Sequence, residues 1–369
     1  MRATRAVIHL DYFKENILNI KKFIAPNVKM CIPVKADAYG HGSIECARAA
    51  LECGADFLSV ATVDEGAELR KAGIKAPILL FSLASPEESS DLVKNDLTPF
   101  VFDSEYIEMI AKEAKKVNKE KYPVHLAVDT GMGRIGCNED EAVFLAEEIV
   151  KNPYLSLGGM ATHFSSSDTK DEESIEYTKK QFKRFLKAIE NVKSKGIEPG
   201  ICHAAASAAT LDLEESHLDM VRPGIIVYGY YADDVNKEYL EKKGKKLDLR
   251  PVMTLESEVS AIKHFTKGQA VGYGRTWIAK EDTDIAVLPI GYGDGLLRHF
   301  AKNGLKIAIK GKNYPVVGRI CMDQCMVDIG PDNKSVKRWD KAIVFGSTED
   351  GALQNAEDIA RANKTISYE

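Results

Sequence analysis

Short apolar runs alternate with longer amphipathic stretches through the first two thirds of the chain, and this alternation restricts the possible folds most strongly. Helical patterns such as SEYIEMIAKEAKKV and TKKQFKRFLKAIENVKSKG separate the apolar runs. Eight runs have the length and residue types of buried strands, at 30–34, 57–61, 78–82, 98–102, 124–128, 157–162, 200–204 and 220–224. Eight strand–helix units in roughly 200 residues predict an α/β fold, an eight-stranded TIM-type barrel.

An open, doubly wound sheet is the alternative arrangement of alternating strands and helices. That fold favours a Gly-rich phosphate turn, GxGxxG, after its first strand. The residues that follow the first strand here are KADAYGHG, a poor match to that turn. The barrel is therefore the preferred prediction.

A helix is expected before the first strand. Asp11 is a residue type that can cap a helix N-terminus, and Phe13, Ile17, Ile20 and Ile24 then fall on one face.

The pattern changes after about residue 228. A charged connector, NKEYLEKKGKKLDLRP, leads into short β-type runs broken by Gly, Pro and Asn, with little helix before NAEDIARANK. These runs include VMTLESEVSAI, IAVLPI, LKIAIKG and KAIVFG. We therefore expect residues 1–240 to form the barrel domain and residues 241–369 a second, mostly β domain.

Composition excludes several classes of function. The chain has 369 residues, 44% of them hydrophobic, and a net charge of −5, so it lacks the basic surface of a nucleic-acid or anionic-membrane binder. The seven cysteines are odd in number and lie mostly in apolar runs, which is typical of reduced thiols. CMDQC has no second Cys/His pair to complete a zinc site, and no metal is predicted. The N-terminus lacks a secretory h-region and no apolar run is long enough for a membrane span, so we expect a soluble cytoplasmic protein.

Five cationic or imidazole side chains follow predicted barrel strands. They are Lys35, Arg134, His163, His203 and Arg222. Taken singly, each has an ordinary explanation as a rim lysine, a core histidine or a surface arginine. Together they would meet at the carboxyl ends of the strands, where barrels of this type carry their chemistry.

This set of side chains suits a phosphate group and an amine nucleophile. Positive side chains and a Gly turn after the eighth strand favour phosphate binding. A lysine at an apolar strand end is partly desolvated, which lowers its pKa and lets it form a Schiff base. Pyridoxal phosphate or a sugar-phosphate aldolase would fit, but the aldolase gives the β domain no role.

Motifs in both domains resemble those of bacterial alanine racemases, in the same order, from residue 2 to residue 369. The motifs are VKADAYGHG, VDTGMGRIG, THFSSSD, RPGIIVYG, VGYGRTW, IGYGDGLLR, GRICMDQCMVD and TISYE. The resemblance implies pyridoxal 5′-phosphate and a head-to-tail homodimer with shared active sites. It implies interconversion of L- and D-alanine by two bases, supplying D-alanine for cell-wall synthesis.

The resemblance also assigns residues. Lys35 matches the lysine that carries the cofactor covalently and serves as one base. Tyr273 matches the second base, which the partner subunit provides. Arg222 matches the arginine that hydrogen-bonds the pyridine nitrogen, with His203 behind it and His163 near the catalytic tyrosine. The phosphate site is matched by Tyr39, Ser207, Gly224, Ile225 and Tyr368. The substrate carboxylate is matched by Arg134 and the backbone of Met322. The entryway from the partner chain is matched by Tyr292, Arg298, Arg319 and Asp323.

Three positions modify this expectation. Ala127 stands where the family often has a carbamylated lysine that steadies the arginine matched by Arg134, so we expect a chloride or a nearby carboxylate there instead. Ala206 replaces a usual asparagine and removes one hydrogen bond near the cofactor. Serine-preferring relatives have a smaller polar residue at Tyr368, so alanine is favoured over the alternative of a serine or broad-specificity racemase.

Three other roles fit the residues less well than racemisation does: decarboxylation, cofactor transport and regulation. Pyridoxal-phosphate decarboxylases on the same barrel keep an acidic residue near the pyridine nitrogen, against which Arg222 argues. A non-catalytic cofactor carrier would be a lone barrel, and a regulatory sensor would not need both Lys35 and Tyr273.

Overall fold

The computed structural model describes residues 3–369, which form two compact units. The first unit comprises Leu10–Leu249 and the second comprises the residues up to His9 together with Arg250–Glu369. No helix within residues 3–369 is both long and apolar enough to cross a membrane.

The first unit is built on eight parallel strands. Their bounds are β2 (Lys29–Pro33), β3 (Phe57–Val60), β4 (Ile78–Leu80), β5 (Leu97–Val101), β6 (Tyr122–Ala127), β7 (Leu155–Ala161), β8 (Ile201–His203) and β9 (Met220–Val221). Their spatial order is β8-β7-β6-β5-β4-β3-β2-β9. The Asp219 N–H donates to Cys202 O (3.0 Å) and the Arg222 N–H to Ala205 O (2.8 Å), so the two ends of the sheet meet. The predicted eight-stranded barrel is confirmed, and the open-sheet alternative is wrong.

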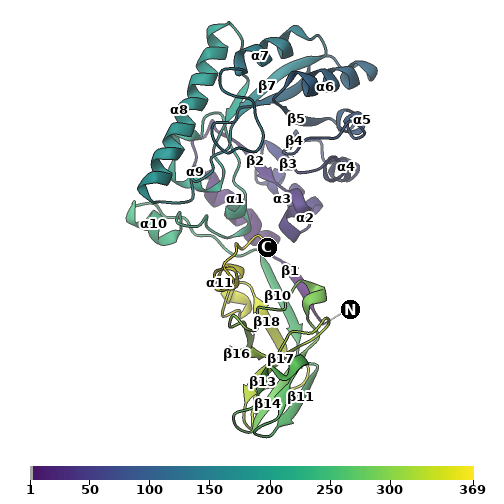
Figure 1. The fold of residues 1–369 in the computed structure, drawn as a ribbon, viewed down its shortest axis with the longest axis vertical. Helices are drawn as coiled ribbons and strands as arrows, with labels where there is room; N and C mark the ends of the chain where they lie inside the picture. Colours follow the sequence, from purple (N-terminus) through teal and green to yellow (C-terminus); the bar gives the residue numbers. More distant parts are fainter. Residues whose placement is uncertain (1–2) are drawn as a thin grey trace. The chain divides into compact units, whose positions relative to one another are not determined.

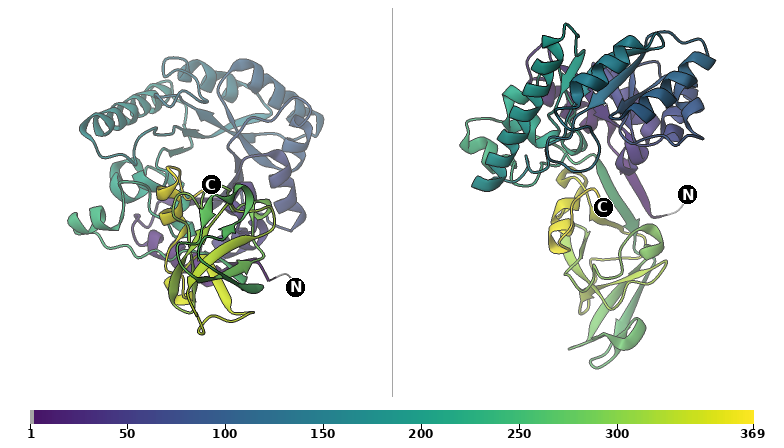
Figure 2. Two further views of the ribbon diagram at one scale, coloured as in Figure 1. Left: turned by 60° about the horizontal axis from the view of Figure 1, so that its bottom comes forward. Right: turned by 45° about the horizontal axis from the view of Figure 1, so that its top comes forward.

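Helices follow the strands and lie outside them (Figure 1). Their bounds are α1 (Leu10–Lys21), α2 (Lys35–Gly40), α3 (Ser43–Glu52), α4 (Val63–Lys71), α5 (Ser89–Lys94), α6 (Ser104–Lys116), α7 (Ala142–Lys151), α8 (Glu172–Ser194), α9 (Ser207–Asp212) and α10 (Lys237–Lys242). In α8, Phe185, Ala188 and Val192 are buried at helical spacing, which holds the helix against the strands. Figure 2 shows the helices forming an arc around the strands.

The first helix differs from the prediction at its start. It begins at Leu10, so Asp11 lies in the first turn and the expectation that Asp11 caps the helix is wrong. The chain reaches helical geometry directly after strand β1, which ends at Ile8. The predicted buried face is confirmed, because Phe13, Ile17 and Ile20 are inaccessible to solvent.

The second unit is an antiparallel sheet with a small helix. Its strands are β1 (Arg5–Ile8), β10 (Met253–Glu258), β11 (Ala261–Phe265), β14 (Thr283–Leu288), β15 (Lys306–Ile309), β16 (Lys312–Val317), β17 (Cys325–Gly330) and β18 (Lys341–Phe345). They lie in the order β1-β10-β18-β15-β16-β17-β14-β11. β12 (Ala270–Val271) and β13 (Trp277–Ile278) form a separate hairpin, and α11 spans Ala356–Ala362.

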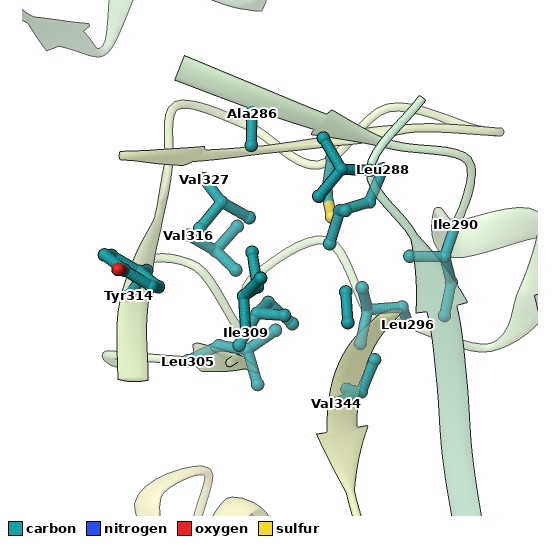
Figure 3. Close-up of a cluster of buried hydrophobic side chains, with 14 of the residues drawn as sticks. Ala286, Leu288, Ile290, Leu296, Leu305, Ile309, Tyr314, Val316, Val327 and Val344 are labelled. Carbon is teal, nitrogen blue, oxygen red and sulfur yellow. The ribbon is translucent and has the colours of Figure 1, made fainter. Parts of the chain in front are cut away.

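Alternating apolar side chains of this sheet form one core (Figure 3). Leu288, Ile309, Val327 and Val344 are among its buried members. The period of two along each strand places these side chains on one face. The predicted mostly β second domain is therefore present.

Strand β1 was not predicted. Arg5–Ile8 lies in the range that the sequence analysis assigned to the barrel domain, yet it pairs antiparallel with β10 in the second unit, Arg5 opposite Glu256. The buried carboxylate of Glu256 forms two ion pairs. Its Oε1 lies 2.5 Å from Arg5 Nε, and its Oε2 lies 2.5 Å from Lys341 Nζ. Long-range pairing of a four-residue strand leaves no local signal that distinguishes it from the start of the barrel.

Two phenylalanines in the barrel unit provide a test of its core. Phe185 in α8 is fully buried, whereas Phe144 in α7 is 58% exposed. We expect Phe185→Ala to lower the free energy of unfolding by about 3–5 kcal/mol through lost burial and a residual cavity. Phe144→Ala should change it by less than about 0.5 kcal/mol. Urea denaturation followed by circular dichroism measures both free energies of unfolding. Similar losses of stability in the two variants would contradict the assignment of Phe185 to the core and of Phe144 to the surface.

Candidate active site

A turn of left-handed helix follows Lys35, shortly after the end of β2. The next four residues, Ala36–Tyr39, all have φ between 50° and 54° and ψ between 39° and 50°. None of them is glycine, and this conformation costs about 1–2 kcal/mol for each such residue. The turn therefore persists only because the surrounding contacts stabilise it, a situation common at functional sites.

Two side chains of the turn's own loop supply such contacts. Asp37 Oδ1 accepts the Ser43 N–H (2.7 Å) at the start of α3. His41 Nδ1 lies 3.0 Å from both Ala38 O and Tyr39 O, and its ring packs against Tyr228 at 4.8 Å between centroids. Asp37 and His41 thus shape and cap the loop.

Arg222 follows β9 and is buried, at 6% exposure. Its guanidinium donates to His203 Nδ1 (2.6 Å), to His163 Nδ1 (3.3 Å), and to the carbonyl oxygens of Thr162 (2.9 Å) and Ala204 (3.1 Å). Burial lowers the pKa of Arg222 to about 10, so it is still charged at neutral pH. No carboxylate within residues 3–369 forms an ion pair with it. The barrel end therefore holds an uncompensated positive charge, which attracts an anion or a hydrogen-bond acceptor.

His125, on β6, extends this chain of contacts and was not predicted. Its Nδ1 lies 2.9 Å from His203 Nε2, and both rings are buried. Burial and Arg222 lower the pKa of His125 to about 3 and that of His203 well below its usual value, so both rings are neutral. Because His203 Nδ1 accepts from Arg222, its proton must sit on Nε2 and point to His125 Nδ1. The order of donors fixes both tautomers.

Lys35, Arg134 and His163 share one electrostatic environment with Arg222. Burial and the nearby Arg134 lower the pKa of Lys35, while Glu65 raises it. Burial, Arg222, Arg134 and Lys35 lower the pKa of His163 to about 3. Arg222 contacts both histidines directly, and Lys35 and Arg134 act on the same groups electrostatically, which supports the predicted convergence of these strand-end side chains.

Arg134 itself is exposed and forms no ion pair with any residue in the described part of the chain. Ala127, at the end of β6, is buried against Phe100 and Ala161, with Ile135 packed nearby. The expectation of a chloride or a nearby carboxylate beside Arg134 therefore stays a prediction.

A small cradle lies near Gly224. A Cβ atom on Gly224 would sit 3.5 Å from Tyr39 Oη and 3.7 Å from Ser207 Oγ, and the Gly224 N–H donates to Ser207 Oγ (2.9 Å). Gly224 also precedes a 3-10 turn, Ile225–Tyr228, whose first N–H groups have no partner within the turn. Two hydroxyls and a turn start around a glycine fit a phosphate group.

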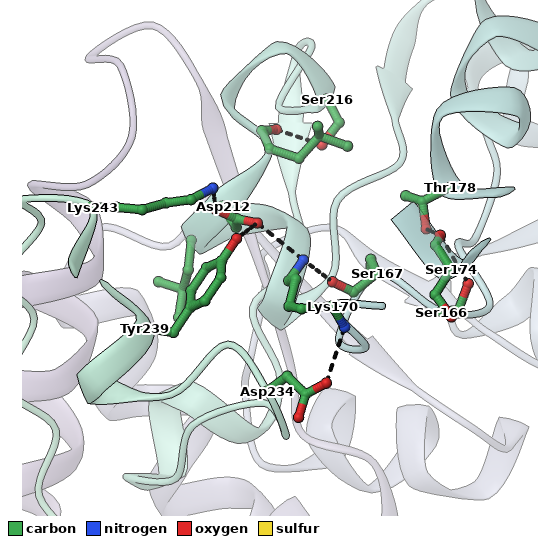
Figure 4. Close-up of polar contacts among 12 residues, drawn as sticks. Ser166, Ser167, Lys170, Ser174, Thr178, Asp212, Ser216, Asp234, Tyr239 and Lys243 are labelled. Atoms are coloured by element: carbon green, nitrogen blue, oxygen red, sulfur yellow. Dashed lines mark hydrogen bonds and ion pairs between the residues drawn. The ribbon is translucent and has the colours of Figure 1, made fainter. Parts of the chain in front are cut away.

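A polar network around Asp212 joins several segments of the barrel unit (Figure 4). Asp212 ends α9, the helix that Ser207 begins, and accepts from Lys243 (2.6 Å), Tyr239 (2.8 Å) and Lys170 (3.0 Å). Burial raises the pKa of Asp212, but these hydrogen bonds outweigh it and the net pKa is lowered. Lys170 lies in the loop that follows His163, so one carboxylate ties two site loops together.

The remaining predicted residues lie in the second unit. Tyr273 is 65% exposed, and the next residue, Gly274, lies so close to the Arg319 guanidinium that a Cβ atom on this glycine would sit 3.1 Å from Arg319 Cζ. The Tyr292 N–H donates to Cys321 O (3.0 Å), beside Met322, which is 55% exposed. Arg298, Asp323 and Tyr368 are also exposed. The loops that carry Tyr273, Tyr292, Arg319 and Met322 therefore meet within this unit.

Both units match the same family. Residues 8–232 match the family described as alanine racemase, N-terminal domain, and residues 252–369 match alanine racemase, C-terminal domain.

Individual relatives agree over the whole length. The alanine racemase of Treponema denticola is 47% identical over 371 residues, covering 100% of this chain and 95% of that protein. The structure of alanine racemase from Clostridium difficile 630 aligns with a TM-score of 0.91 at 38% identity, covering 100% of this chain and 92% of the other. A complex of that racemase with cycloserine aligns at a TM-score of 0.89 and 37% identity, with the same coverage.

The left-handed turn after Lys35 can be tested by replacing alanine with glycine at two sites. The free energy of unfolding should rise at the site in the turn and fall at a site in an ordinary helix. Ala36 is exposed and has a φ of 50°, so Ala36→Gly should raise the free energy of unfolding by about 0.5–1 kcal/mol. Ala67→Gly, in the right-handed helix α4, should lower it by about 1 kcal/mol. Urea denaturation of both variants measures this, and a loss of stability in Ala36→Gly would show that the turn is not left-handed in solution.

Proposed function

This chain belongs to the alanine racemase family and is an isomerase, and we propose that it interconverts L- and D-alanine with pyridoxal 5′-phosphate held on Lys35. The observation that carries the proposal is the barrel end itself. A lysine of lowered pKa, a buried arginine with no carboxylate partner within residues 3–369, and a cradle of two hydroxyls around a glycine follow neighbouring strands there.

The residues present fit this cofactor. Tyr39, Ser207 and the start of the Ile225–Tyr228 turn would hold its phosphate. Arg222 would donate a hydrogen bond to its pyridine nitrogen. When bound, pyridoxal phosphate supplies an electron sink for the negative charge that develops at the substrate α-carbon.

Arg222 would determine which reaction follows. A guanidinium keeps its proton at working pH and donates only, so the pyridine nitrogen that accepts from it stays unprotonated. Burial and Arg222 lower the pKa of His163 to about 3 and that of His203 well below its usual value, so neither ring is an imidazolium that could protonate the nitrogen instead. A weaker sink disfavours long-lived negative charge at carbon and so favours return of the proton, which is racemisation, over transamination.

Racemisation needs two bases on opposite faces of the α-carbon. Lys35 would serve as one, because its lowered pKa increases the share of the neutral amine that can accept a proton at Nζ. Tyr273 would serve as the other. Its exposure and its place beside Arg319 support a role in which the second unit of a partner subunit presents this phenol to the barrel. The active protein would then be a head-to-tail homodimer with shared sites.

Substrate selection would depend on a few further groups. Arg134 and the backbone of Met322 would bind the substrate carboxylate, and Tyr292, Arg298, Arg319 and Asp323 would line the entryway. The side chain of Tyr368 is larger than the polar residue found there in serine-preferring relatives, and it leaves less room for a hydroxymethyl group. We therefore propose that the preferred substrate is alanine rather than serine. The product, D-alanine, would serve cell-wall synthesis in the cytoplasm.

Removal of one phenol tests the two-base mechanism. Tyr273→Phe should slow removal of the α-proton of L-alanine by about 10²–10⁴-fold, the usual contribution of a positioned base, while the visible absorbance of the bound cofactor remains. Proton–deuterium exchange followed by NMR in D₂O measures the step, with L-serine as a second substrate. Tyr314→Phe, in the same unit, is the matched control and should keep its rate.

Lys35→Ala should lose both the covalent cofactor and the activity. Full activity of Tyr273→Phe would remove Tyr273 as a base, and equal turnover of serine would contradict the substrate assignment.

A second prediction concerns the exposed, unpaired Arg134. If chloride takes the place of the carbamylated lysine absent at Ala127, exchange of chloride for acetate should lower kcat/KM several-fold and restoring halide should recover it. A crystal grown in bromide should show an anomalous peak beside the Arg134 guanidinium. Equal rates in both salts, with no anion at that guanidinium, would show that Arg134 is held in another way.

A further inference from the structure

The carboxylate of Glu65 joins three backbone N–H groups where the chain leaves β2 and β3. Glu65 is the third residue of α4, and its Oε2 accepts from Ala61 (2.7 Å) and Thr62 (3.3 Å), which completes a capping box with the Thr62 hydroxyl. Its Oε1 accepts the Ala36 N–H at 2.7 Å. A capping box requires only the bonds to the start of its own helix. The bond to Ala36 is therefore an additional contact.

This contact fixes the backbone on one side of Lys35. On the other side, the Val34 N–H donates to Ser59 O on β3 (2.8 Å). The backbone is thus tied to β3 just before Lys35 and to the start of α4 just after it. Because Ala36 is the first residue of the strained left-handed turn, its N–H anchor also sets the direction in which that turn begins. We propose that Glu65 is a positioning residue for Lys35, acting through the Ala36 N–H to aim the lysine side chain.

The charge of Glu65 acts in the same direction as its geometry. Arg134 and Arg222 make the barrel end cationic, and Glu65 is the carboxylate that opposes burial and Arg134 in their effect on the pKa of Lys35. Charge-assisted hydrogen bonds are stronger than neutral ones, so the ionised carboxylate also suits three N–H donors better than an amide would. In terms of function, this role rests on the proposed assignment of Lys35 as cofactor carrier and base.

A purely structural role would be confined to the start of α4, and the chain offers a matched control for it. At the start of α5, Glu88 Oε2 accepts the Ser85 N–H (2.8 Å) and Ser85 Oγ accepts the Glu88 N–H (3.3 Å). This is the same reciprocal arrangement without a contact to the Lys35 turn. Glu88→Gln therefore reports what loss of the charge of a capping carboxylate does by itself.

The test compares Glu65→Gln with Glu88→Gln in the holoenzyme. Glutamine offers one acceptor oxygen and one NH₂ donor, so it cannot accept from both Ala36 and Ala61. In Glu65→Gln we expect kcat to fall about 10-fold or more through misplacement of Lys35. We also expect the pH transition of the cofactor absorbance to move to lower pH, because a negative charge near the lysine nitrogen is lost. Glu88→Gln should leave both within twofold of the wild type.

Glu65→Asp separates position from charge and decides the matter if the glutamine variant does not fold. Aspartate keeps the charge and can still cap α4, but it is one methylene shorter and draws away from Ala36. We expect kcat to fall several-fold while the absorbance transition stays where it is in the wild type. A wild-type kcat in Glu65→Asp, or an equal loss in Glu88→Gln, would overturn the proposal.

Failure of the proposed function can be told apart from failure of this inference. If the wild type binds the cofactor but does not racemise alanine, the absorbance transition still reports the effect of Glu65. Hydrogen–deuterium exchange of the segment Lys35–Gly40 needs no activity, and it should be faster in Glu65→Gln but unchanged in Glu88→Gln. Unchanged exchange and an unchanged transition in Glu65→Gln would refute the positioning role.

Discussion

The barrel end depends on a buried guanidinium whose partners are all uncharged. Arg222 is held by two imidazoles and two carbonyl oxygens, so its charge is oriented but not neutralised. Burial, together with this cation, lowers the pKa of His163 and His203 and keeps both rings neutral, and the bonds of Arg222 tie together the residues at the ends of β7, β8 and β9. A carboxylate in place of the imidazoles would have satisfied the arginine and removed its affinity for an outside acceptor. The neutral partners therefore leave the arginine available to a ligand.

The left-handed turn after Lys35 shows the same principle in the backbone. Four non-glycine residues adopt a conformation that local preferences disfavour, and Asp37, His41 and Glu65 offset the cost from three directions. Local preference and global fold usually agree in natural sequences, and disagreement is concentrated at functional sites. Here the disagreement begins at the residue after Lys35, the proposed cofactor lysine.

The barrel could be predicted because its strands are short apolar runs at regular intervals, which is a local pattern. The strand-end residues Lys35, Arg134, His163, His203 and Arg222 could be predicted for the same reason. His125 could not, because a histidine inside an apolar strand has no local mark of its bond to His203. The left-handed turn was also missed, since Ala, Asp and Tyr favour ordinary conformations. Glu65 did have a signal, the TVDE capping box, but that pattern does not reveal the extra contact with Ala36.

The pairing of β1 with β10 has a consequence for how the chain acquires its structure. Strand β1, which precedes the whole barrel in the sequence, is an edge of the second unit's sheet, and Arg5 pairs with Glu256, 251 residues further along the chain. Contacts so distant in sequence form slowly, because a large loop must close before they are made. The barrel, by contrast, is contiguous and can fold on the ribosome as its strands emerge. Until then β1 has no partner, and in its absence β10 would be an open edge on which a second molecule could add a strand. The order of synthesis thus makes the second unit the last to be completed, although one of its strands precedes the whole barrel in the sequence.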